Sequence, residues 1–130
     1  MPMNLLYRAL FAAAIFFVAL NYAAKPAEAL RIAKKEMERR QDIFMRDAYA
    51  WAIQANGGFA EAHAEMIKAL SVGFRDPVFL YHAGMIAMKN GQTLESIRYL
   101  RGSLKQAEQS SVAKLVHQAL ESQLTSVNSK

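Results

Sequence analysis

Apolar residues recur every three or four positions along most of the chain, which is the spacing that one face of an α-helix requires. One such stripe begins after Pro26 and reaches Ala55, so we predict a single long helix there. The stripe comprises Leu30, Ala33, Met37, Phe44, Ala48, Trp51 and Ala55. Four further helices are predicted: one over about 59–71, one from Pro77 to about Asn90, one from about Thr93, and one from Ser110 or Ser111. No stretch alternates Val, Ile and Thr with the period of a strand, so the predicted fold class is all-α.

Asn-Gly pairs divide this helical pattern at a regular interval. Asn56-Gly57 recurs as Asn90-Gly91, and each pair stands where an apolar stripe ends. At the same interval Ala50 matches Gly84, so that a small residue recurs in both helices. A period of about 34 residues that covers two helices is the signature of tetratricopeptide repeats.

The chain resembles the tetratricopeptide repeat family over about residues 43–110. The family's small residue in the first helix of each repeat, helix A, falls on Ala50 and Gly84. Its glycine at the hairpin falls on Gly57 and Gly91. The amino-acid sequence of this region is also similar to the last two repeats of longer bacterial members of the family. The resemblance therefore implies an α-solenoid built from antiparallel helix pairs.

The predicted domain boundaries combine this resemblance, which sets the repeats and the capping helix, with the apolar pattern of the N-terminal segment. These are 1–29 as a signal peptide or membrane anchor, 30–42 as an N-terminal extension of the first helix, 43–76 and 77–110 as repeats, 111–124 as a capping helix, and 125–130 as a tail. The first repeat departs from the family at Arg46, whereas Leu80 fits at the matching position of the second. Two repeats are fewer than usually bury a continuous core, so the flanking helices or a partner must cover the ends.

Gly84 lies inside a predicted helix, where glycine costs about 1 kcal/mol relative to alanine. In the register of the repeat, Gly84 lies where helix A crosses the second helix, helix B, opposite Ser96 and Leu100. Two helices cross closely only where the side chains between them are small. We predict that the close approach of the two backbones offsets the lost helix propensity.

The N-terminal segment 1–29 has the layout of an export signal. Arg8 precedes a charge-free apolar run over 10–24, Pro26 ends that run, and small residues precede a cleavage site after Ala29. Cleavage there would give a periplasmic or extracellular protein. The alternative is an uncleaved inner-membrane anchor over 5–24, in either orientation, because basic residues both precede and follow the run.

The side chains offer no constellation for catalysis or metal binding. The chain has no cysteine, and His63, His82 and His117 lack the i,i+4 spacing that places two metal ligands on one helix face. No nucleophile-elbow or phosphate-binding glycine motif occurs. We therefore expect no enzyme activity and no cofactor.

The charge of the chain also argues against nucleic acid as the partner. The formal net charge of +5 over 130 residues is a weak electrostatic footprint. Arg98, Arg101 and Lys105 form a short basic stripe, but Tyr99 is the only aromatic residue beside it. Such stripes are usually solvated helix faces, so we do not expect nucleic-acid binding.

The resemblance implies that the A helices form an inner, ligand-binding face. The candidate partner-binding residues on that face are Phe44, Asp47, Trp51, Gln54, Tyr81, Met85, Met88 and Lys89. Aromatic and methionine side chains would give it an adaptable apolar surface. The alternative is that Trp51 and the methionines simply pack against the N-terminal helix or the next repeat.

These features predict a non-catalytic module, exported or attached to a membrane, that binds a peptide or a subunit of a larger assembly. The expected partner is another protein, and contact with a membrane would use residues 5–24. An oligomer of the chain itself is left open. The alternative is a membrane-tethered structural subunit, in which the long helix 27–55 is a stem between the bilayer and the repeats.

Overall fold

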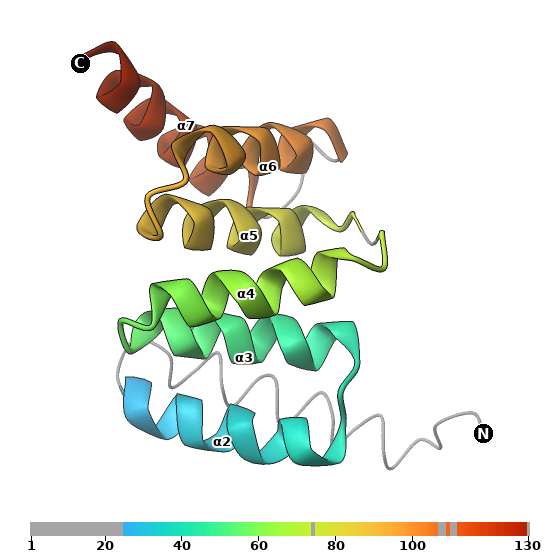
Figure 1. The fold of residues 1–130 in the computed structure, drawn as a ribbon. Helices are drawn as coiled ribbons and strands as arrows, with labels where there is room; N and C mark the ends of the chain where they lie inside the picture. Colours follow the sequence, from blue (N-terminus) through green and yellow to red (C-terminus); the bar gives the residue numbers. More distant parts are fainter. Residues whose placement is uncertain (1–24, 74, 107–108, 110–111, 130) are drawn as a thin grey trace. The chain divides into compact units, whose positions relative to one another are not determined.

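The computed structural model describes residues 25–73, 75–106, 109 and 112–129 (Figure 1). Every regular element among these residues is an α-helix, which confirms the predicted all-α class. The helices are α2 (Pro26–Arg39), α3 (Ile43–Ala55), α4 (Phe59–Leu70), α5 (Pro77–Lys89), α6 (Thr93–Gln106) and α7 (Ala113–Asn128). The apolar run 10–24, on which the export and anchor predictions depend, lies outside the described residues.

The chain divides into two compact units, Met1–Glu65 and Met66–Lys130. The described part of the first unit contains α2, α3 and the first half of α4. The second unit contains the rest of α4 with α5, α6 and α7. Each unit has a buried cluster of its own.

In the first unit the chain turns back at residues 40–42, so the prediction of one long helix from Pro26 to Ala55 is wrong. Arg40 adopts an extended conformation, and α3 begins anew after Asp42. The Asp42 carboxylate accepts hydrogen bonds from the backbone N–H groups of Phe44 and Met45, at 3.1 and 3.0 Å. This N-cap satisfies amide donors that would otherwise lack partners, which favours a new helix start over continuation.

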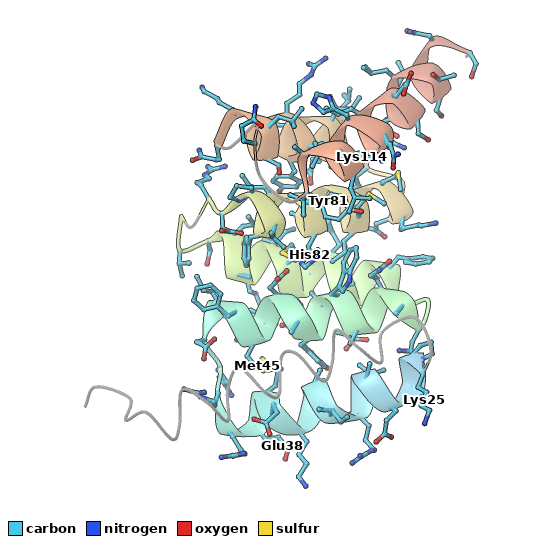
Figure 2. All side chains as sticks on the ribbon, turned by 180° about the vertical axis from the view of Figure 1, so that it is seen from behind. Lys25, Glu38, Met45, Tyr81, His82 and Lys114 are labelled. Atoms are coloured by element: carbon cyan, nitrogen blue, oxygen red, sulfur yellow. The ribbon has the colours of Figure 1, made fainter. Side chains whose placement is uncertain are left out.

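The helices α2 and α3 pack side by side as an antiparallel pair (Figure 1). Ala29 and Ala33 of α2 are fully buried in one cluster with Met45 and Ala52 of α3, and Met45 lies between the two helices (Figure 2). At the open end, the Asn56 side-chain amide donates to the Pro26 carbonyl oxygen at 2.9 Å. Residues 30–42 are therefore no extension of the first helix, and 27–55 is not a straight stem.

In the second unit, α5 and α6 cross where Gly84 was predicted to face α6, and that prediction is confirmed. The Ser96 hydroxyl donates to the Gly84 carbonyl oxygen at 2.8 Å. A Cβ atom on Gly84 would come within 2.6 Å of Leu100 Cδ2 and 3.3 Å of the Ser96 carbonyl oxygen. A second hydroxyl joins the pair near its other end, because Ser103 donates to the Pro77 carbonyl oxygen at 2.6 Å.

The helix α7 packs on α6 and closes the core of the second unit. The buried cluster comprises Ile97, Leu100, Val112, Val116, Ala119 and Leu120. The helix begins at Ala113 and continues to Asn128, so the predicted capping helix 111–124 and polar tail 125–130 are corrected. Thr125 and Ser126 are polar, but neither glycine nor proline interrupts the chain there, and exposed polar residues do not stop a helix.

The helix starts follow the predicted repeat period. The helices α3 and α5 begin at Ile43 and Pro77, and α4 and α6 begin at Phe59 and Thr93. The hairpin turns match as well. Gly57 and Gly91 both adopt positive φ, +85° and +77°, which glycine alone adopts without strain. The division of the chain into repeats at 76/77 stays a prediction.

Candidate functional site

The candidate partner-binding residues lie on two helices, α3 and α5, which belong to different units. Four of the eight lie on α3. Phe44 is exposed over 48% of its surface, whereas Asp47 and Trp51 are half-buried and Gln54 is buried. Phe44 is thus the most exposed member of this group.

The other four candidates lie on α5, and two of them take part in the core. Tyr81 and Met85 are half-buried and pack against the cluster that α6 and α7 form. Burial raises the pKa of the Tyr81 hydroxyl above its usual value. Tyr81 also lies beside His82, with 5.9 Å between the ring centroids (Figure 2). Packing within the second unit therefore explains in part why Tyr81 and Met85 present apolar surface, a property that the sequence-based prediction attributed to partner binding.

Met88 and Lys89 complete the α5 group at the C-terminal end of the helix. Met88 is half-buried and Lys89 is exposed. Membership of all eight residues in one binding face stays a prediction. What the structure adds is a gradient of accessibility, from buried Gln54 to exposed Phe44 and Lys89.

Arg46, the departure from the family pattern, has a structural role in the first unit. Its guanidinium Nη1 lies 2.6 Å from Oε2 of Glu65 on α4, and both side chains are mostly buried. A partly buried, charge-assisted hydrogen bond of this kind is stronger than one between neutral groups. The arginine therefore joins α3 to α4 where the family places another large residue.

Tyr49 lies near the carboxylates of Glu61 and Glu65. Burial raises the pKa of the Tyr49 hydroxyl, and the negative charges of Glu61 and Glu65 raise it further, because ionised tyrosine would add another negative charge. The phenol therefore stays protonated and neutral at physiological pH.

The described residues contain no group of three or more His, Cys, Asp or Glu side chains that could hold a metal ion. His63 is buried on α4, His82 is half-buried on α5, and His117 is exposed on α7. The expectation of no enzyme activity and no cofactor stays a prediction. None of the helices described from Pro26 onward is long and apolar enough to cross a membrane.

The second unit also has a cavity of about 360 Å³ that the sequence did not reveal. Its lining residues are Leu70, Arg75, Leu80, Arg98, Tyr99 and Gly102. Of these, Arg98 was considered from the sequence as part of a basic stripe, Tyr99 as the aromatic residue beside it, and Leu80 as a residue that fits the repeat pattern. Gly102, a second glycine inside a helix, was the available signal.

Comparison with known proteins places this architecture. No protein-family model matches the chain, and no curated protein matches it. A solved structure that does match is the type III secretion chaperone SycD of Yersinia enterocolitica in complex with a peptide of the translocator YopD. The TM-score is 0.70, the sequence identity is 16%, and the match covers 95% of this chain and 98% of that one.

A structural match at 16% sequence identity establishes the fold and does not establish the function. The matched chaperone has a tetratricopeptide-like helical fold. The chain accordingly has an all-α helical-repeat fold of the tetratricopeptide-like kind, as its repeat period predicts.

Proposed function

We propose that this protein is a non-catalytic binding module that holds a segment of another protein against its helix pairs. The observation that carries the proposal is the fold shared with SycD, whose solved complex contains a peptide of YopD. The side chains support it, because α3 presents an exposed aromatic ring at Phe44 within a helix that otherwise packs closely. Aromatic anchors of this type carry a large share of the binding energy in protein interfaces.

Site-specific crosslinking tests this function. A photoreactive phenylalanine analogue at Phe44 should give a crosslinked polypeptide when the cells of the native host are irradiated. The matched control is the same analogue at Leu94 on α6, which exposes 81% of its surface and is outside the candidate set. A discrete product from Phe44 and none from Leu94 supports the proposal. Equal, diffuse products from both positions, or none from either, contradict it.

We further propose that the module is exported or attached to a membrane. The support is the charge-free run 10–24, with Arg8 before it and small residues before the bond after Ala29. Sequencing the N-terminus of protein made in a bacterial host separates the two forms. Leu30 as the first residue supports export, whereas Met1 in a carbonate-resistant membrane fraction supports an anchor. An intact Met1 in the soluble fraction contradicts both.

The structure bears on the exported form, because α2 begins at Pro26 and the cleavable bond lies inside it. A chain that starts at Leu30 lacks the Pro26 carbonyl that accepts the Asn56 hydrogen bond, and it lacks buried Ala29. It retains Ala33 and the rest of α2. The exported form should therefore keep the α2–α3 pair with a lower thermal midpoint than the uncleaved chain.

A further inference from the structure

Gly102 lies inside α6, and helix packing does not explain it. A Cβ atom on Gly102 would meet only Leu80 Cδ1, at 3.6 Å, which is an ordinary van der Waals contact. At Gly84, by contrast, the same addition would come within 2.6 Å of Leu100. Glycine destabilises a helix relative to alanine, so a glycine that packing does not require calls for another explanation. Gly102 lines the cavity of the second unit, and its missing side chain leaves that cavity open.

Two positively charged arginine side chains line the same cavity. Arg75 precedes α5 and Arg98 is on α6, and both side chains are exposed. Neither forms an ion pair with any residue that the structure describes. The nearest acidic residue in sequence to Arg75 is Asp76, whose carboxylate instead accepts hydrogen bonds from Val78 N and Phe79 N. The two arginines therefore line the cavity with positive charge. Asp76, the acidic residue next to Arg75 in the sequence, does not neutralise it.

The rest of the lining suits an acidic side chain on a polypeptide. Leu70 and Leu80 supply apolar surface, and the Arg98 guanidinium lies over the Tyr99 ring, 5.5 Å from its centroid. Such stacking orients a guanidinium, and a guanidinium can bind a carboxylate through two parallel hydrogen bonds. About 360 Å³ is at the small end of ligand sites, enough for one acidic side chain with an apolar neighbour.

We propose that this cavity binds a carboxylate side chain from an acidic segment of a partner protein, between Arg75 and Arg98. Nucleic acid fits less well, because single strands need several aromatic rings along a basic groove and this cavity has one. The identity of the ligand as a protein segment rests on the proposed function. None of the cavity's lining residues belongs to the candidate set on α3 and α5, so the cavity adds a second contact.

A peptide titration of the full-length chain tests the site. The probe is acetyl-Gly-Glu-Leu-Glu-Gly-amide, its matched control replaces each Glu by Gln, and the readout is the Gly102 backbone amide in nitrogen–proton NMR spectra. We expect a saturable shift with the Glu peptide and none with the Gln peptide. Inorganic phosphate is the third ligand. If phosphate binds as tightly as the Glu peptide, the assignment to a carboxylate is overturned.

Variants separate a cavity from a diffuse basic surface. Arg75→Gln and Arg98→Gln should each weaken the Glu peptide about ten-fold, because each removes a charge-assisted hydrogen bond. Arg101→Gln is the matched control, since Arg101 is exposed on the same helix and does not line the cavity. It should change binding by less than about two-fold. Equal losses in Arg98→Gln and Arg101→Gln would overturn the proposal.

Gly102→Ala tests the cavity without changing any charge. The variant should raise the thermal midpoint through helix propensity and yet weaken the Glu peptide, because the new methyl group narrows the cavity. Unchanged peptide affinity in this variant contradicts the cavity. Because the probe is a defined peptide, failure here leaves the crosslinking result at Phe44 standing, and the two proposals fail separately.

Discussion

The hairpins α2–α3 and α5–α6 bring two helices together with different small residues. The first uses Ala29, Ala33 and Ala52, which are good helix formers, so close packing there carries no cost in helix propensity. The second uses Gly84, which costs about 1 kcal/mol in propensity and admits the Leu100 side chain and the Ser96 backbone. The difference shows that the α5–α6 crossing leaves no room for a side chain at Gly84, whereas the α2–α3 pair accommodates alanine methyl groups.

The largest effect is expected at the glycine crossing. Gly84→Leu should lower the free energy of unfolding by about 3 kcal/mol, because its first added atom already overlaps Leu100 and crowds the Ser96 carbonyl. Chemical denaturation monitored by circular dichroism gives this value. An unchanged midpoint would mean that α5 and α6 do not cross at this residue.

A somewhat smaller effect is expected at the alanine pair. Ala33→Leu should lower the free energy of unfolding by about 2 kcal/mol, because Ala33 is fully buried between α2 and α3. Ala27→Leu, an exposed position on the same helix, is the control and should be nearly neutral. Equal midpoints for both variants would favour the single long helix over the hairpin.

The caps of the two hairpins offer a direct comparison at matching positions. Asp42→Ala and Asp76→Ala should each lower the free energy of unfolding by about 1 kcal/mol, because each carboxylate accepts two backbone hydrogen bonds at a helix start. Thermal denaturation of both variants is the measurement. A loss at Asp76 with none at Asp42 would show that the turn between α2 and α3 does not depend on its cap.

The smallest effect has the opposite sign. Gly102→Ala should raise the free energy of unfolding by about 0.8 kcal/mol, because packing leaves room for the methyl group. Gly84→Ala is the matched change in the other helix of the pair and should be destabilising. If both substitutions stabilise the protein, the contrast between the two glycines is lost.

The sequence predicted the structure best where helix-capping and helix-ending residues agreed with the register of the repeat. Asp76, Pro77 and the Asn90-Gly91 pair place α5 correctly, and the register places Gly84 opposite Leu100. These signals are local, or they repeat at a fixed interval. Each of these signals can therefore be read without knowledge of the tertiary structure.

The break between α2 and α3 escaped prediction because the apolar stripe passes through it. Met37 and Phe44 lie at a heptad spacing, which keeps the helical phase, and no glycine or proline interrupts the segment 40–42. The missed signal was Asp42, which stands one repeat period before Asp76 and caps its helix in the same way. In the structure, a helix start capped by Asp42 interrupts the continuous hydrophobic pattern.

The candidate site was predictable only as a set of positions. Which members are accessible depends on packing, and Tyr81 and Met85 pack against the cluster that α6 and α7 form, through contacts that periodicity cannot supply. The arginine-lined cavity was less predictable still. It requires Arg75 from the segment before α5 and Arg98 from α6 to line one space, which only the folded chain reveals.

The most direct measurement of the proposed function is calorimetric titration of the polypeptide segment that crosslinks to Phe44. With the wild-type protein we expect saturable binding of one segment per chain. Phe44→Ala should weaken that binding about ten-fold or more, and Leu94→Ala should leave it nearly unchanged. No heat of binding to the folded wild-type protein, or equal affinities for all three proteins, would contradict a partner held on the α3 surface.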